Sequence, residues 1–191
     1  MLLSQLTNKP IYVGKNKKGV CRGIGISLKT QNVKHLLASI NESFDYSIDF
    51  AVGTTYIQDV TISIRLSRFR SCFPKNCAKL FIGLPVFSHD GAFLGNVVDV
   101  EFNDFVASKL LTSLNVWWPV SCIIACSDAV ILKKEQPYPI GQRIPAPMLF
   151  DFLQQNEKNE PIVTKPVLKD AVKNGALIKL TLSLPPFYLN A

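Results

Sequence analysis

The sequence predicts an all-β protein made of two tandem small β-barrels and a C-terminal helix-strand tail. Three observations favour this fold. A set of patterns occurs twice, roughly 70–75 residues apart. Most apolar residues alternate with polar or small residues, and short runs of turn-forming residues separate the alternating segments. A repeat of this length is too long for a solenoid unit and fits two domains in tandem.

The first copy is predicted to begin with a short strand at 10–12 (Pro-Ile-Tyr). Turn residues rich in Lys, Asn and Gly occupy 14–19, and alternating apolar positions at 24–26 predict the next strand. An apolar pair within 33–39 and a β-branched run at 59–64 predict further strands, because β-branched side chains suit a pleated, half-buried surface.

The second copy shows the same features in the same order. It begins at 85–87 (Pro-Val-Phe), and the Asp-Gly pair at 90–91 is a strong hairpin signal because glycine adopts positive φ without steric cost. Residues 97–102 alternate, and 106–113 carry the apolar pair. The copy ends at 128–132 with an aspartate followed by an apolar run, which we equate with the aspartate and β-branched run of the first copy.

These patterns place a first barrel at 1–75, a second barrel at 80–147 and a tail at 148–191. The segment 71–79, with a proline between two cysteines, is interpreted as the linker. The proline-rich run 137–147 is expected to leave the second barrel in an extended form. Each copy is near the size at which a lone domain is only marginally stable, so we expect the copies to pack on each other or on the tail.

The tail is predicted to contain a short helical segment at 148–155, a polar loop at 156–160 and a helix at 166–173. Asn-Gly at 174–175 ends that helix. Apolar residues alternate with polar ones at 178–184, which predicts a strand. A strand this apolar must be covered, by a barrel or by a second chain, so the tail strand is also a candidate contact in a homo-oligomer.

The formal net charge of +7 is unevenly distributed. Residues 1–80 contain twelve Lys and Arg against four Asp and Glu, whereas residues 81–150 contain four against six, and residues 151–191 five against four. If this charge marks a partner, the first copy meets it. The alternative is that a positive surface only keeps the protein in solution.

The composition indicates a folded, cytoplasmic protein with 48% hydrophobic and 18% charged residues. The N-terminus is too short and too polar for a signal peptide. The longest apolar stretch, 116–125, contains a proline and falls short of the ~20 residues that span a bilayer, so no integral membrane segment is expected. Five cysteines, an odd number, argue for reduced thiols.

The second copy, from 84 to 132, resembles the PRC-barrel family, named for the photosynthetic reaction centre H subunit and shared by the C-terminal module of a ribosome maturation factor. The common pattern is a short Pro-[Ile/Val]-[Tyr/Phe] strand, a turn, a glycine and an alternating strand. The first copy departs from it, with Gly23 where the second has Asp99 and a longer loop at 39–54. The resemblance covers about 140 residues. It implies six-stranded barrels that dock proteins or ribonucleoprotein, without a shared catalytic residue.

The cysteines are expected to be mainly structural. Cys21 lies in an alternating strand and is expected to be buried. Cys122 and Cys126 would be ~13 Å apart on one strand face, too far to share a zinc ion, and are interpreted as small core residues. Cys72 and Cys77 flank the linker proline, and a metal or redox role stays open for them.

No residue pattern predicts an enzyme. His35 and His89 are the only histidines, and no pattern places a nucleophile, a base and an orienting group together. The glycines within 19–25 lack the lysine and the helix of a phosphate-binding loop. We therefore expect no catalytic residue, no cofactor and no metal.

The candidate binding residues lie mostly in the basic first copy. Its turn lysines and the arginines around its last strand would form one positive patch if both lie at the same rim. Phenylalanines interleave with these charges, as do side chains that stack on bases or fill a protein pocket. One of two adjacent tryptophans on a strand must also face away from the core. The candidates are Lys15, Lys17, Lys18, Arg65, Arg68, Arg70, Phe73, Trp117 and Trp118.

Two functions stay open at this point. The first is an adaptor that docks a protein partner through its barrels and tail. The second is a ribonucleoprotein or RNA-associated factor that uses the basic first barrel, as the ribosome maturation module would imply. In a third interpretation the patch is only a solvated rim and Phe69 lies in the core. Separately, the acidic loop 41–49 could fold over the patch and neutralise it. Bacterial proteins that resemble this chain also suggest a cell-structure or sporulation role.

Overall fold

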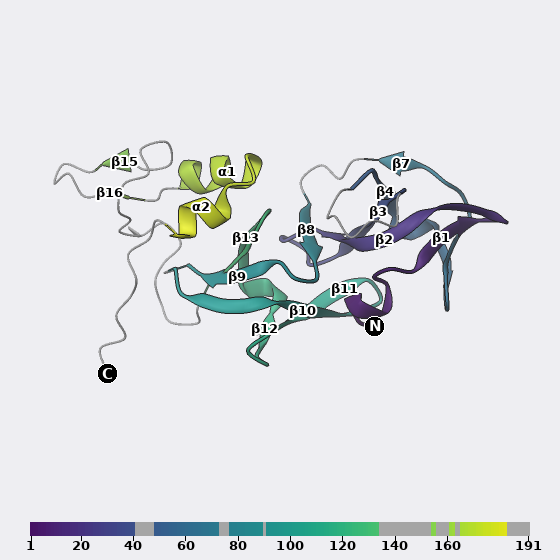
Figure 1. Cartoon of the computed structure of the whole chain (residues 1–191), viewed down its shortest axis with the longest axis horizontal. Coiled ribbons are helices and arrows are strands. Elements are labelled where there is room, and N and C mark those ends of the chain that lie inside the picture. The colour runs from purple at the N-terminus through teal and green to yellow at the C-terminus, as the bar shows by residue number, and fades with distance from the viewer. Residues whose placement is uncertain are drawn as a thin grey trace.

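Most of the protein forms β-strands in two large sheets, which confirms the predicted all-β class (Figure 1). None of the helices in the stretches described is long and apolar enough to cross a membrane. The computed structural model describes residues 1–40, 48–72, 77–89, 91–133, 154–155, 161–162 and 165–182.

The first copy forms six strands in the order β5-β6-β1-β2-β3-β4, and we call this unit barrel 1. Neighbouring strands are antiparallel except β1 and β6, which run parallel. A short 3-10 helix, η2 (Thr54–Tyr56), joins β4 to β5. The strands are β1 (Pro10–Val13), β2 (Asn16–Ile26), β3 (Val33–Ser39), β4 (Phe50–Gly53), β5 (Ile57–Val60) and β6 (Ile64–Leu66).

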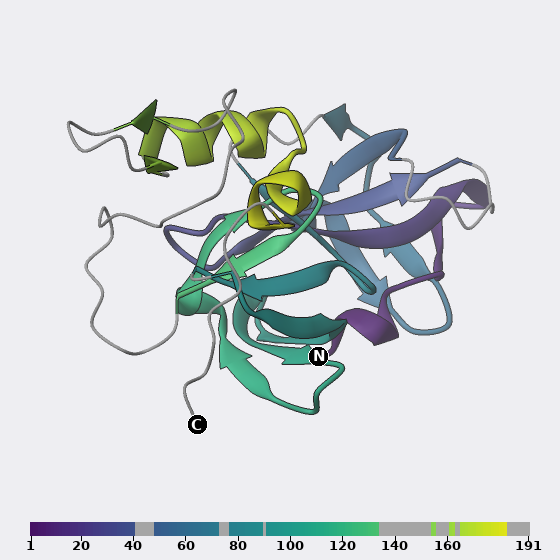
Figure 2. The ribbon, with the colours of Figure 1, turned by 60° about the vertical axis from the view of Figure 1, so that its left-hand side comes forward.

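The second copy has the same topology, in the order β13-β14-β9-β10-β11-β12, and we call it barrel 2. Figure 2 shows it in teal and green beside barrel 1, which is purple and blue. Again only one pair, β9 with β14, is parallel, and a 3-10 helix, η3 (Val120–Cys122), precedes the fifth strand. The strands are β9 (Pro85–Ser88), β10 (Phe93–Asn103), β11 (Val106–Thr112), β12 (Trp117–Pro119), β13 (Ile123–Cys126) and β14 (Val130–Leu132).

The strand registers make the two copies equivalent residue by residue. Tyr12 on β1 pairs with Arg65 on β6, as Phe87 on β9 pairs with Ile131 on β14. The β-bulges of β2 and β10 also fall at matching places, so that Gly23 is equivalent to Asp99, as the sequence comparison predicts.

The last part of the repeat was predicted in the wrong register. Asp59 pairs with Arg65, whereas its counterpart Ala125 pairs with Ile131, so Asp59 is equivalent to Ala125. Counting on from these pairs, Asp128 is equivalent to Ile62. The error arises because the longer loop of the first copy changes the spacing between repeats before β5.

A pseudo-two-fold axis relates the barrels. Asn32 and Val106 occupy equivalent positions, and they form a β-bridge with each other. Contacts in which residue i meets j and j meets i are the mark of an isologous interface. The flanking hydrogen bonds repeat the symmetry, from Val33 N to Phe105 O at 2.6 Å and from Ala107 N to Gln31 O at 2.9 Å.

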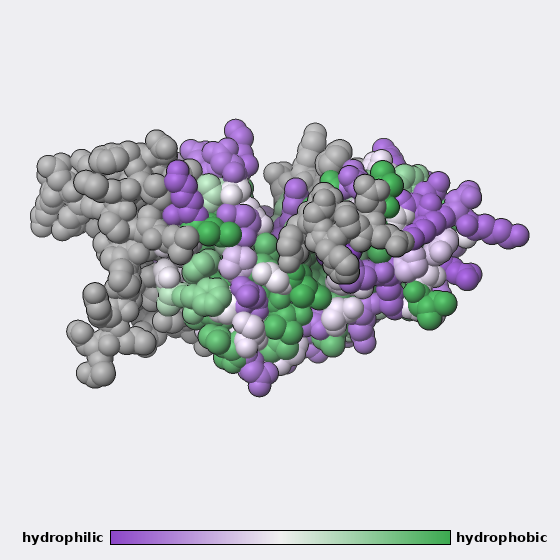
Figure 3. Space-filling view, in the orientation of Figure 1, coloured by the Kyte–Doolittle hydropathy of each residue, from purple (hydrophilic) through white to green (hydrophobic). Residues whose placement is uncertain are grey.

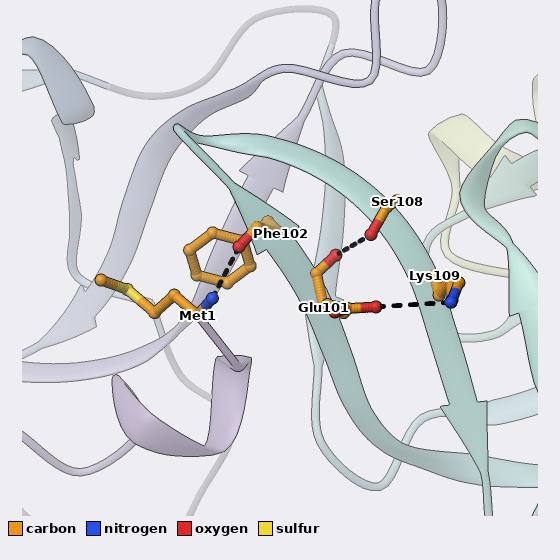
Figure 4. Close-up of polar contacts among 5 residues, drawn as sticks. All are labelled: Met1, Glu101, Phe102, Ser108 and Lys109. Atoms are coloured by element: carbon orange, nitrogen blue, oxygen red, sulfur yellow. Dashed lines mark hydrogen bonds and ion pairs between the residues drawn. The ribbon is translucent and has the colours of Figure 1, made fainter.

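Each barrel is completed by the segment that precedes the other barrel. Strand β8 (Ala78–Phe81) precedes barrel 2 but pairs with β2 of barrel 1. The N-terminal residues precede barrel 1 but pair with β10 of barrel 2 (Figure 4). The Met1 ammonium donates to Phe102 O at 2.8 Å, and Phe102 N donates to Met1 O at 2.9 Å.

The segment 71–79 is therefore more than a linker. Its ends form β7 (Ser71–Cys72), which extends barrel 1 beyond β4, and the beginning of β8. Gly23 permits the close approach of β8, since a Cβ there would lie 2.4 Å from the Leu80 carbonyl oxygen.

One hydrophobic core runs through both barrels. The N-terminal 3-10 helix η1 (Leu3–Gln5) contributes the fully buried Leu3, and Leu6 follows it. Asp99, which is buried, fixes this helix by accepting hydrogen bonds from the Ser4 amide at 3.0 Å and the Ser4 hydroxyl at 2.5 Å. The barrels are thus held together by shared strands, a polar anchor and common apolar packing.

Over residues 165–182, the longest described part of the tail, the chain forms two helices where the sequence predicted a helix followed by a strand. Helix α1 (Lys165–Lys173) agrees with the prediction, and Gly175 adopts φ +62° just beyond it. The strand prediction for 178–184 was wrong, because Leu177–Leu182 is helix α2. Leu177 and Leu180 are buried in this helix against barrel 2, so tertiary packing overrides the alternating pattern. A homo-oligomer contact through a tail strand therefore loses its basis.

Most of the remaining tail predictions lie outside the described residues. The predicted helical segment at 148–155 is described only at its end, where β15 (Gln154–Gln155) pairs with β16 (Pro161–Ile162) instead. The predicted loop 156–160 is not among the described residues.

Candidate functional site

Barrel 2 binds the tail on the outer face formed by β9, β13 and β14, which we call the tail face (Figures 1 and 2). The contact is apolar on both sides. The barrel residues are Phe87, Ala125, Ala129 and Ile131, and the helix residues are Val167, Ala171, Leu177 and Leu180. All eight are buried.

Asp128 fixes the start of α2 on the tail face. Its carboxylate accepts hydrogen bonds from Leu177 N at 2.9 Å and Ile178 N at 3.1 Å. These amides would otherwise lack partners, because the first N–H groups of a helix have none within it. The aspartate that the sequence marks as the end of the repeat is therefore a helix cap supplied from the barrel.

The equivalent face of barrel 1 has a different chemistry, and we call it the basic face: Tyr12, Lys17, Asp59, Ile62 and Arg65. Lys17, Tyr12, Arg65 and Asp59 are consecutive cross-strand partners on β2, β1, β6 and β5. Lys17, Asp59 and Arg65 are exposed, and Tyr12 is half-buried. Ile62, at the turn between β5 and β6, is 89% exposed.

The remaining basic candidates lie beside this face, at the rim where β1 and β6 end. The parallel pairing of Val13 with Leu66 brings the β1–β2 turn and the segment after β6 to the same end of barrel 1. We call Lys15, Lys18, Arg68 and Arg70 the basic rim. Figure 3 shows hydrophilic surface over β1 and β2 at this end of the molecule.

Aromatic rings underlie two cations of the basic rim. Lys18 Nζ lies 5.5 Å from the centroid of the Phe69 ring, and the Arg68 guanidinium lies 4.5 Å from that of Tyr56. Phe69 is 39% exposed and packs edge-on against Phe50, with ring centroids 5.3 Å apart. Phe69 is thus neither a core residue nor a free surface ring.

The tryptophan candidates are not part of this cluster. They lie on β12 of barrel 2, where Trp117 is 44% exposed and Trp118 packs against the core. The Trp118 Nε1 is buried and has no hydrogen-bond partner among the described residues. Phe73 lies outside the described residues. Of the acidic loop, Asp49 is described, and its carboxylate accepts a hydrogen bond from Ile40 N at 2.7 Å.

Two cysteines are poorly suited to act as nucleophiles. Burial raises the pKa of Cys21 and of Cys126 to about 12, so both remain thiols at neutral pH. Cys126 lies on β13, whereas the half-buried Cys122 belongs to η3. The prediction that both cysteines lie on one strand was therefore wrong.

The structure brings together one pair that the sequence does not indicate. The His35 Nδ1 and the Cys77 Sγ are 3.8 Å apart, on either side of Gly25. Burial, with a smaller effect from Lys34, lowers the pKa of His35. Within the described parts of the chain, no group of three His, Cys, Asp or Glu side chains could hold a metal ion.

No family model matches the chain, and no curated protein matches it.

Proposed function

We propose that this protein is a non-enzymatic adaptor that docks a protein partner through its tandem barrels. One observation carries the proposal: barrel 2 already holds a pair of helices on its outer face. The same topology recurs in barrel 1, where the equivalent face is exposed. A module that binds helices within its own chain is suited to bind a segment of another protein.

The cores of the barrels also support a binding role. Large side chains fill them, among them Ile24 and Leu36 of barrel 1 and Phe102 and Leu110 of barrel 2. A packed interior leaves recognition to the outer faces. Two of the five cysteines, Cys21 and Cys126, are held as buried thiols, which is consistent with structural use.

Membership of the PRC-barrel family is part of this proposal, as is a cytoplasmic location. Six strands in the same order in both copies support the family assignment. The buried thiols of Cys21 and Cys126 support a reducing compartment.

A ribonucleoprotein role is the second candidate, and the basic rim favours it. Lys18 lies over a partly exposed ring, Phe69, and such combinations of cation and aromatic group also bind single-stranded nucleic acid. Phosphate-dominated binding should weaken steeply as salt rises from ~50 to ~200 mM. Replacing Arg65, Arg68 and Arg70 together with glutamine should then abolish RNA retention.

Capture from a native extract, with and without nuclease, tests the adaptor proposal. The full chain should retain a protein after nuclease treatment, and the purified protein should form a complex of defined stoichiometry with it. A partner lost on nuclease treatment would favour the ribonucleoprotein role. Failure of every captured protein to bind in purified form would refute the adaptor role.

A further inference from the structure

The pseudo-symmetry allows the two outer faces to be compared position by position. On barrel 2 the face is apolar and covered by α1 and α2, whereas on barrel 1 the positions are mostly polar and exposed. Phe93 and Lys17 are matched as the β10 and β2 partners of Phe87 and Tyr12. From barrel 2 to barrel 1 the changes are Phe87 to Tyr12, Phe93 to Lys17, Ala125 to Asp59, Asp128 to Ile62 and Ile131 to Arg65.

We infer that the basic face binds an acidic, amphipathic helix of a protein partner, at the place that corresponds to the tail on barrel 2. This inference rests on the proposed adaptor function and specifies its binding face and ligand. The backbone of the face is the same as that of the tail face. Its side chains differ from those of the tail face, so the helix that it binds must have a different composition.

Charge determines the first property of that helix. Arg65 and Lys17 stand where barrel 2 has Ile131 and Phe93, so an apolar helix at this place would cover two charged side chains instead of two apolar ones, which is costly. Asp59 is the one acidic residue of the basic face, and the basic rim adjoins the face. Glutamates or aspartates on the bound helix would complement this surface.

Ile62 determines the second property. It is 89% exposed at a turn, the highest value among the large apolar side chains described, and it stands where Asp128 caps α2. An isoleucine cannot cap a helix, but it can pack on one. With the half-buried Tyr12, it offers apolar contact that a phosphate backbone would not use. The helix should therefore be amphipathic, and a protein fits this face better than RNA.

A peptide titration of the ¹⁵N-labelled full chain tests the inference by NMR. The probe is a synthetic helix of about 18 residues, or five turns, made of Ala, Leu and Glu with the glutamates along one face. A matched peptide carries Lys in place of Glu. The test variant is Lys17→Glu with Arg65→Glu, and the control is Lys29→Glu with Lys34→Glu, which makes the same charge change at exposed positions of barrel 1.

The acidic peptide should shift resonances of β1, β5 and β6, and the lysine peptide should not. The test variant should bind about tenfold more weakly, and the control variant within about twofold of the unaltered protein. Ile62→Ser should also weaken binding without affecting the salt dependence, because it removes an apolar contact and no charge.

Three outcomes would overturn the inference. The first is that both double variants bind the acidic peptide equally well, or that the peptide shifts only barrel 2 resonances; an adaptor that captures its partner through another surface would still stand. The second is that a uridine oligomer shifts resonances of the basic face while the acidic peptide shifts none, which would favour the ribonucleoprotein role. Failure of the peptide, together with failure of every captured partner to bind in purified form, would refute the adaptor function as well.

Discussion

Replacing Asp128 with alanine should release the tail from barrel 2 while leaving both barrels folded. The carboxylate accepts hydrogen bonds from two α2 amides, Leu177 N at 2.9 Å and Ile178 N at 3.1 Å. Loss of a capping side chain costs about 0.5–2 kcal/mol. Because two amides lose their acceptor and Asp128 is partly exposed, we expect about 1–2 kcal/mol for the docked tail.

Native-state hydrogen exchange measures this change where it occurs. A loss of 1–2 kcal/mol corresponds to about a 5–30-fold increase in the open population, and hence in exchange of α2 amides such as that of Leu180. Asp128→Asn keeps one acceptor oxygen and should have an intermediate effect. Asp59→Ala removes an exposed carboxylate on barrel 1 and serves as the matched control.

The reasoning fails if Asp128→Ala leaves α2 exchange unchanged. It fails equally if the substitution lowers the unfolding midpoint of the whole protein without a selective effect on the tail. The first result would mean that the apolar contacts alone hold the helices. The second would mean that the tail and barrel 2 unfold as one unit.

Three other perturbations test the packing of the barrels, each followed by urea or thermal unfolding. Gly23→Ala should lower the free energy of unfolding by about 1–3 kcal/mol, because its Cβ would lie 2.4 Å from a β8 carbonyl oxygen. Gly25→Ala, with no contact nearer than 3.5 Å, is the matched control on the same strand. Ser4→Ala should cost about 1–3 kcal/mol by depriving a buried carboxylate of a donor, whereas the exposed Ser108→Ala should cost little. The pKa of His35 is lowered from its ordinary value of 6.5, so around that pH the folded protein binds fewer protons than the unfolded chain. The free energy of unfolding should therefore fall as the pH decreases from about 7 to 5. His35→Gln should reduce this pH dependence.

The repeat and most strands could be predicted from the sequence because alternation is a local signal. The alternating runs at 24–26 and 97–102 predict β2 and β10, and Gly175 predicts that α1 ends just before it. Helix α2 could not be predicted in this way. Its sequence alternates as a strand would. It is helical because two features distant in the sequence stabilise it: Asp128 accepts a hydrogen bond from its first amide, and the tail face covers its apolar residues.

The basic rim was also foreseeable, since the lysines of the β1–β2 turn and the arginines after β6 were expected to meet if they shared an edge. The parallel pairing of β1 with β6 provides that edge. The comparison of the basic face with the tail face was not foreseeable. It depends on the equivalence of Ile62 with Asp128, which the longer loop in the first copy conceals. The contact between His35 and Cys77 likewise depends on β8 crossing to barrel 1.

The exchange of edge segments between the barrels has a consequence for proteolysis. After a backbone cut anywhere between Cys72 and Cys77, the two fragments would remain associated through these paired segments. Met1 and Leu2 of the N-terminal fragment would still bind β10 of the C-terminal fragment, and β8 of the C-terminal fragment would still pair with β2. A nicked molecule should therefore migrate as an intact particle under native conditions and separate into two pieces only in denaturant.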